Sequence, residues 1–112
     1  MAFNKTLLSG SISLLILKLL EEQDMYGYQM IETLRERSDH TFDMKAGTLY
    51  PLLHTLEQKG FVEAHEDTQS ARPRRYYHLT DHGRRQLVDQ EAEFRTYANT
   101  VLRILDGGAC FA

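Results

Sequence analysis

The apolar residues of the first 60 positions repeat at helical spacing in three separate stretches. From Leu8 onward they follow the i, i+4, i+7, i+8, i+11 spacing of one helical face, which predicts a first helix. A second helix is predicted over about 26–37 and a third over about 46–59, where Gly60 is a typical helix-ending residue. Pro51 lies inside the third stretch, so we expect a kink or a 3₁₀ start in its first turn. The second and third stretches follow each other as in a helix-turn-helix unit.

Two shorter stretches after Gly60 have strand character. Residues 61–66 and 74–79 flank the turn-like segment 67–73, which together predict a two-stranded hairpin. Because side chains alternate along a strand, Tyr77 and Leu79 share one face of the second strand and Arg74 lies on the other.

A long helix is predicted to follow the hairpin. Thr80 or Asp81 can cap its start, and its apolar pattern continues to about residue 105. Leu87, Phe94 and Val101 recur every seven residues along it, a spacing typical of helices that pair with another helix.

Two features predict that the chain forms a homodimer. The last helix, of about 25 residues, extends beyond what a three-helix core can cover. In the first helix, Leu14 and Leu17 lie off the main apolar stripe, so part of that helix is expected to face a partner. The expected dimer-interface residues are Leu14, Leu17, Leu87, Phe94, Tyr97, Val101, Leu102 and Leu105.

These elements predict a mainly α fold with a small β-hairpin, in the order α-α-α-β-β-α. This is a winged helix-turn-helix with a long C-terminal dimerisation helix. A length of 112 residues, 42% of them hydrophobic, fits one folded domain. Within it we expect a DNA-binding unit over 1–80, a dimerisation helix over 81–106 that belongs to the same compact unit, and a tail over 107–112.

The charge balance limits how the chain can bind nucleic acid. Its formal net charge of -3 excludes a histone-like protein that holds DNA by bulk charge alone, so any such binding must use a local patch. Cys110 is the only cysteine, which rules out an internal disulfide and favours a reducing cytoplasm. The apolar stretch 14–20 is interrupted by Lys18 and is far short of the ~20 residues that span a bilayer, so no membrane partner is expected.

The third predicted helix carries small or hydrogen-bonding side chains opposite its leucines. When a helix-turn-helix docks on DNA, the N-terminal part of its second helix enters the major groove. Lys45, Thr48, Tyr50 and His54 are therefore candidates to meet base edges and phosphates. On this pattern alone, a plain solvated helix face explains the same residues equally well.

The hairpin favours the DNA-binding interpretation. Residues 68–80 contain three arginines, interleaved aromatics and no acidic residue, which makes them the most concentrated positive segment of the chain. Arg72, Arg74 and Arg75 are candidates to contact phosphates or a narrow minor groove, as in the wing of a winged helix. The alternative is an exposed edge hairpin whose charges prevent aggregation.

The chain resembles the PadR family of bacterial winged-helix transcriptional regulators. The resemblance rests on GTLYPLL at 47–53, LE at 56–57 with Gly60, RRYYHLT at 74–80 with Gly83, and YGY at 26–28. It covers about residues 8–105, and the short C-terminal part is similar to a smaller subfamily with one long dimerisation helix. The chain departs from the family where Lys45 and Ala46 replace a common cap followed by proline, and where Thr55 replaces a frequent basic residue.

The resemblance implies a homodimeric, ligand-responsive repressor. Because a dimer presents one recognition helix per subunit about a two-fold axis, its DNA operator is expected to be an inverted repeat. By position it places Thr48 and Tyr50 on the recognition helix and Arg72, Arg74 and Arg75 on the wing. The chain has no tryptophan, so a drug pore lined by that residue is not expected. Phe94 and Tyr97 are instead candidates to stack a flat aromatic or amphipathic effector, although plain interface packing explains such aromatics too.

An enzyme is not predicted. The five histidines show no HExxH or paired Cys and His spacing, and the serines lack a GxSxG elbow, so no catalytic residue, cofactor or metal site is expected. The alternative function is a winged-helix module whose wing arginines bind an acidic protein partner instead of a specific DNA sequence.

Overall fold

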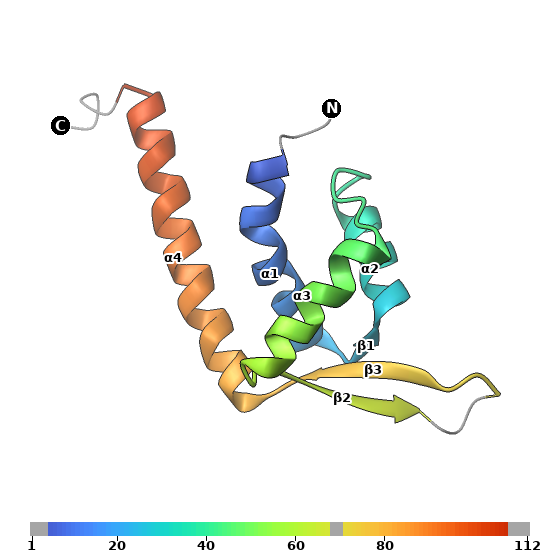
Figure 1. The fold of residues 1–112 in the computed structure, drawn as a ribbon. Helices are drawn as coiled ribbons and strands as arrows, with labels where there is room; N and C mark the ends of the chain where they lie inside the picture. Colours follow the sequence, from blue (N-terminus) through green and yellow to red (C-terminus); the bar gives the residue numbers. More distant parts are fainter. Residues whose placement is uncertain (1–4, 68–70, 108–112) are drawn as a thin grey trace.

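Four helices and three strands make up the part of the chain that the computed structural model describes, residues 5–67 and 71–107 (Figure 1). In chain order they are α1 (Lys5–Glu22), β1 (Met25–Tyr26), α2 (Gly27–Arg37), α3 (Ala46–Gln58), β2 (Val62–Asp67), β3 (Arg74–Leu79) and α4 (Asp81–Leu105). The predicted mainly α fold with a hairpin and a long last helix is confirmed, with the addition of β1. Cys110 and nearly all of the predicted tail lie outside the described residues.

The strands form one antiparallel sheet in the order β1-β3-β2. The hairpin register pairs Val62 with Leu79 at its base and Asp67 with Arg74 toward its tip. β1 adds one short edge, on which Met25 lies opposite Tyr77. Sequence patterning missed β1 because a strand of two residues has no period to detect.

The core lies between the helices and one face of this sheet. Helix α1 contacts α2, α4 and β3, so it is surrounded on more than one side. The buried apolar residues are Ile16, Leu17, Leu19, Leu20, Met25, Met30, Ile31, Leu34, Met44, Leu49, Leu53, Leu56, Phe61, Val62, Tyr77, Leu79 and Leu87. The wide apolar surface of α1 is therefore used largely within the protomer.

This burial corrects two of the predicted dimer-interface residues. Leu17 is 0% exposed and Leu87 is 1% exposed, so neither side chain is available to a second copy. Leu17 faces the core because α1 has neighbours on several sides, and Leu87 lies in the part of α4 that packs on α1. Leu14 is half-buried, and the remaining predicted interface residues on α4 are exposed.

A joint of hydrogen bonds connects the end of α3 to the start of α4. Gly60, at φ +78°, ends α3, and its N–H donates to the Glu57 carbonyl at 3.0 Å, as predicted for a C-terminal glycine. The Thr80 hydroxyl donates to the Gly60 carbonyl at 2.7 Å and accepts from the Gly83 N–H at 2.9 Å. The predicted cap of α4 is thus Thr80, and the same side chain holds α4 against the end of α3.

Replacing Gly83 tests this joint. A Cβ at this position would collide with the Phe61 carbonyl and the Leu79 side chain, and backbone cannot easily move aside. Gly83→Ala should therefore lower the free energy of unfolding by about 1–3 kcal/mol in urea titrations. The control is Gly47→Ala, where the added methyl meets open space and the change should stay below about 1 kcal/mol. Equal effects of the two variants would contradict a tight joint.

Candidate nucleic-acid interface

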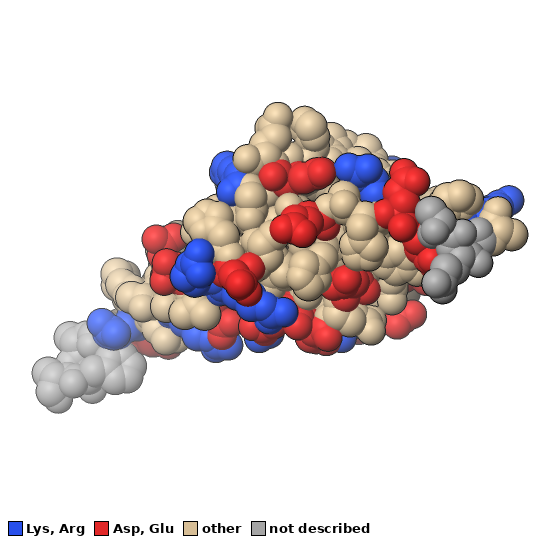
Figure 2. All heavy atoms as spheres, turned by 90° about the horizontal axis from the view of Figure 1, so that it is seen from below, with Lys and Arg blue, Asp and Glu red and all other residues tan. Residues whose placement is uncertain are grey.

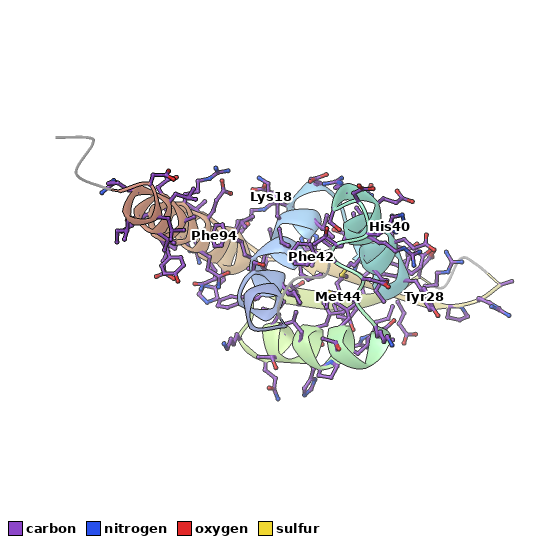
Figure 3. The ribbon with its side chains drawn as sticks, turned by 90° about the horizontal axis from the view of Figure 1, so that it is seen from above. Lys18, Tyr28, His40, Phe42, Met44 and Phe94 are labelled. Atoms are coloured by element: carbon purple, nitrogen blue, oxygen red, sulfur yellow. The ribbon has the colours of Figure 1, made fainter. Side chains whose placement is uncertain are left out.

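The outward face of α3 is the first part of the candidate interface. Three buried leucines, Leu49, Leu53 and Leu56, fix this helix against the core. Its opposite side points away from α1 and α2 (Figure 3), and the predicted residues Lys45, Thr48, Tyr50 and His54 are all exposed there.

The first turn of α3 shows no separate 3₁₀ segment before Pro51. The Thr48 and Leu49 N–H groups both donate to the Lys45 carbonyl, at 2.9 and 3.0 Å, a shared arrangement that is common at helix ends. From Ala46 to Gln58 the segment is one α-helix that passes through Pro51. The outward side chains therefore sit on a continuous, rigid element.

Tyr50 is fixed more firmly than the sequence indicates. A Cβ on Gly27 would collide with the Tyr50 hydroxyl and ring, so the phenol lies directly against the start of α2. The absence of a side chain at Gly27 is what lets the Tyr50 ring lie here. With 43% of its surface exposed, Tyr50 contributes part of a ring to the outward face and also sets the packing of α3 on α2.

The wing arginines lie on different sides of the hairpin. Arg75 is on the side of α3, where its Nη2 is 3.2 Å from the Oε2 of Glu57. Arg74 is on the other side, with its guanidinium carbon 4.5 Å from the centre of the Tyr26 ring. Arg72 is exposed, in the stretch between the two strands of the hairpin. The structure thus places Arg75 next to the α3 face and separates Arg74 from it.

Arg75 also lies beside an aromatic ring. Its guanidinium carbon is 5.9 Å from the centre of the Tyr77 ring. The Tyr77 hydroxyl and, after it, the Glu57 carboxylate raise the pKa of Arg75 above its ordinary value. The group is therefore a permanent cation, half exposed, at the border between the wing and α3.

The opposite face of the sheet carries a cluster of histidines and tyrosines that sequence reasoning missed. The Nδ1 of His78 is 2.8 Å from Asp24, and the Nε2 of His65 is 3.9 Å from the same carboxylate. Tyr76 stacks on His65 with ring centres 5.9 Å apart and meets Tyr26 edge-on at 5.4 Å. These residues come from three separate segments, so only the strand register brings them together.

This underside is poorly suited to DNA. Figure 2 shows Asp and Glu side chains scattered over it, with Lys and Arg side chains mainly toward α4 and at its margins. On β2, Glu63 lies opposite His78 and so shares its face of the sheet. The acidic side chains on this face disfavour a phosphate backbone, so the α3 side is the better candidate interface.

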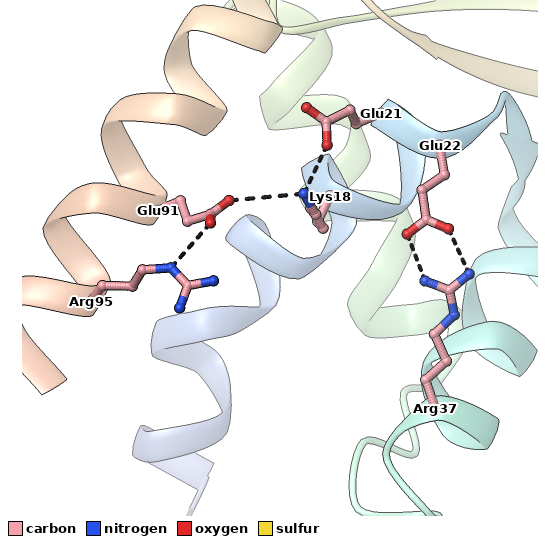
Figure 4. A network of polar contacts seen from close by, with 6 residues as sticks. All are labelled: Lys18, Glu21, Glu22, Arg37, Glu91 and Arg95. Carbon is pink, nitrogen blue, oxygen red and sulfur yellow. Dashed lines mark hydrogen bonds and ion pairs between the residues drawn. The ribbon is translucent and has the colours of Figure 1, made fainter.

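Ion pairs tie α1 to the helices on either side of it (Figure 4). Lys18 is 2.9 Å from Glu21 and 3.9 Å from Glu91 on α4. Arg37 on α2 forms two hydrogen bonds to Glu22, at 2.6 and 2.7 Å. The hydrogen bond from Arg37 lowers the pKa of Glu22, and the bond to Glu21 raises the pKa of Lys18. These exposed pairs orient α1 rather than add much stability.

Grooves run along both sides of the α1–α4 contact, next to Phe94 (labelled in Figure 3). One has a volume of about 370 Å³ and is lined by Leu14, Leu15, Lys18, Glu91, Phe94, Arg95, Ala98 and Asn99. The other includes Tyr97 as well as Phe94. The two predicted effector residues therefore border open space and are 45% and 67% exposed.

The described part of the chain has neither a metal-binding cluster nor a membrane-spanning helix. No three His, Cys, Asp or Glu side chains there lie close enough to hold a metal ion. None of the described helices is both long enough and apolar enough to cross a membrane.

Comparisons with known proteins agree with this arrangement. Residues 16–89 match the model of the transcriptional regulator PadR-like family. The chain is 30% identical to transcriptional regulator Rv3488 of Mycobacterium tuberculosis over 83% of this chain and 84% of that protein. A PadR family regulator from Eggerthella lenta has a similar structure, with a TM-score of 0.79, 35% identity and coverage of 89% of this chain and 86% of the other. A regulator from Clostridium thermocellum reaches a TM-score of 0.83 at 25% identity, over 90% and 96% of the two chains. The chain belongs to the PadR-like family of transcriptional regulators.

Proposed function

We propose that this DNA-binding regulator is a repressor that acts in the cytoplasm as a homodimer on an inverted-repeat operator. The observation that carries the proposal is that α3 presents exposed polar side chains and that Arg75 of the wing contacts Glu57 of the same helix. In such folds a helix usually contacts the bases, while a nearby cation contacts the phosphates. Two recognition helices related by a two-fold axis would address half-sites about 34 Å, or a multiple of it, apart.

We assign different roles to the candidate residues. Thr48 and His54, with the exposed part of Tyr50, lie on a rigid helix, and we expect them to discriminate base edges. We expect Lys45 at the start of α3 and Arg72 and Arg75 on the wing to contact phosphates. Arg74 faces the acidic underside, so we expect it to hold the wing against Tyr26 and to contribute less to binding.

Salt-dependent binding separates these roles. With DNA from upstream of its own gene and a random duplex as ligands, Arg75→Ala should weaken binding to both. The salt slope, which is the slope of the logarithm of the binding constant against the logarithm of the salt concentration, should fall in magnitude. The expected fall is about one released counterion per subunit. Arg74→Ala should change the salt slope less. Thr48→Ala should reduce the difference in affinity between the upstream DNA and the random duplex and leave the salt slope unchanged. An Arg75→Ala protein with a normal slope would show that the wing is misassigned.

The same titration tests the alternative function. If no duplex binds to the wild-type chain, the proposal is wrong and binding to an acidic protein partner becomes the function to test.

We also propose that α4 supplies most of the dimer interface. It projects beyond α1 (Figure 1), and six large apolar residues of its second half are at least 36% exposed: Phe94, Tyr97, Val101, Leu102, Ile104 and Leu105. The radius of gyration of 16.4 Å exceeds the ~13 Å of a compact domain of this length, as expected for a protomer that pairs through a projecting helix.

A charge placed on this apolar face should separate the subunits. Burying a carboxylate without a partner is costly, so Phe94→Asp should be monomeric at micromolar concentration in sedimentation analysis. Thr96→Asp adds the same charge on another side of α4 and serves as the control. If Phe94→Asp sediments as a dimer, the interface lies elsewhere.

We propose, finally, that a planar aromatic or amphipathic effector binds beside Phe94 and Tyr97. A ligand shifts DNA binding only if it prefers one arrangement of the two recognition helices over the other. In a titration of DNA-bound protein with planar aromatic compounds, those that bind the wild type but not Phe94→Ala should change DNA affinity. Compounds that bind at this place and leave DNA affinity unchanged would disprove the effector role.

A further inference from the structure

Glu57 is an acidic residue on the proposed DNA-binding side of the molecule. It is the only Asp or Glu in α3, and it lies in the last turn of that helix. Its carboxylate contacts Arg75 of the wing through one hydrogen bond of 3.2 Å, and the two side chains are 34% and 51% exposed. The Glu57 carboxylate is therefore paired with the Arg75 guanidinium, the same cation that the proposed function pairs with a DNA phosphate.

The contact is of the kind that a phosphate can displace. It is a single bond between exposed groups, unlike the two-bond pair of Arg37 with Glu22. Exposed pairs of this type contribute little net stability. Phosphate oxygens are also strong acceptors for a guanidinium.

We propose that Glu57 competes with DNA phosphate for Arg75 and thereby limits the affinity of the protein for DNA of any sequence. This inference rests on the proposed DNA-binding function. In the free protein, Arg75 and Glu57 together contribute no net charge to the interface. On binding, Arg75 turns to a phosphate and leaves the carboxylate unpaired close to the DNA backbone. Each subunit consequently delivers one less effective positive charge than its arginines suggest.

Glu66 and Glu63, two other acidic residues of the hairpin, form no ion pair with Arg75. Glu66 lies opposite Arg75 in the β2–β3 register and so shares its face, but among the described residues it forms no ion pair. Glu63 lies on the opposite face, across from His78. Glu66 is therefore a matched control: its removal deletes the same charge from the same face without releasing Arg75.

The experiment measures binding of a labelled random-sequence duplex across a potassium chloride series by fluorescence anisotropy. Glu57→Gln should bind about two- to fivefold more tightly than wild type at low salt. Its salt slope should be steeper by about one counterion per subunit, so the two proteins converge at high salt. Glu66→Gln should have a smaller effect. In an Arg75→Ala background, Glu57→Gln should lose most of its gain, which separates competition for Arg75 from general repulsion of DNA.

Three results would overturn the inference. Unchanged or weaker binding by Glu57→Gln would mean that Glu57 positions Arg75 instead of competing for it. A gain that persists in the Arg75→Ala background, or that Glu66→Gln matches, would reduce Glu57 to one repelling charge among others. Failure of the wild-type chain to bind any duplex would instead refute the proposed function, and thermal unfolding followed by circular dichroism checks that each variant is folded.

Discussion

The hydrogen bonds of Thr80 fix how α3 and α4, the helices of the proposed DNA and dimer interfaces, lie relative to each other. One hydroxyl bonds the end of α3 through Gly60 and the start of α4 through Gly83, and the Thr80 N–H bonds the Phe61 carbonyl at 3.1 Å. Gly83 has no space for a side chain, so α4 lies directly on the backbone that follows α3. In a dimer built on α4, this joint would convert the angle between two α4 helices into the separation of two α3 helices.

How much the sequence predicts depends on the range of the interactions involved. The bounds of α4 and the start of α3 were predicted correctly because caps and apolar periodicity are local signals. Leu17 and Leu87 were misplaced because a helix apolar on several sides can face either its own core or a partner, and only packing decides between these. The cluster around Asp24 was missed because strand register, which no single sequence shows, brings His65 and His78 together.

The candidate interface shows the same limit. Alternation along β3 correctly placed Arg74 on the face opposite Tyr77, yet the charge count of the hairpin treated all its arginines alike. Which face of the hairpin meets α3 is a tertiary fact, and it separates Arg75 beside Glu57 from Arg74 beside Tyr26. Composition locates a positive segment, but only the fold shows which of its charges point the same way.

A DNA-binding chain with a formal net charge of -3 has to arrange its charges over short distances. At physiological salt the Debye length is about 8 Å, so acids on the underside of the sheet are largely screened from DNA bound along α3. Charges within that range of the interface are not screened in this way, and Glu57 is one of them because it contacts Arg75. If DNA binds along α3 as proposed, its affinity for the protein depends less on total charge than on a few pairs at the border of the wing and α3. A single carboxylate there would then influence binding more than several on the opposite face.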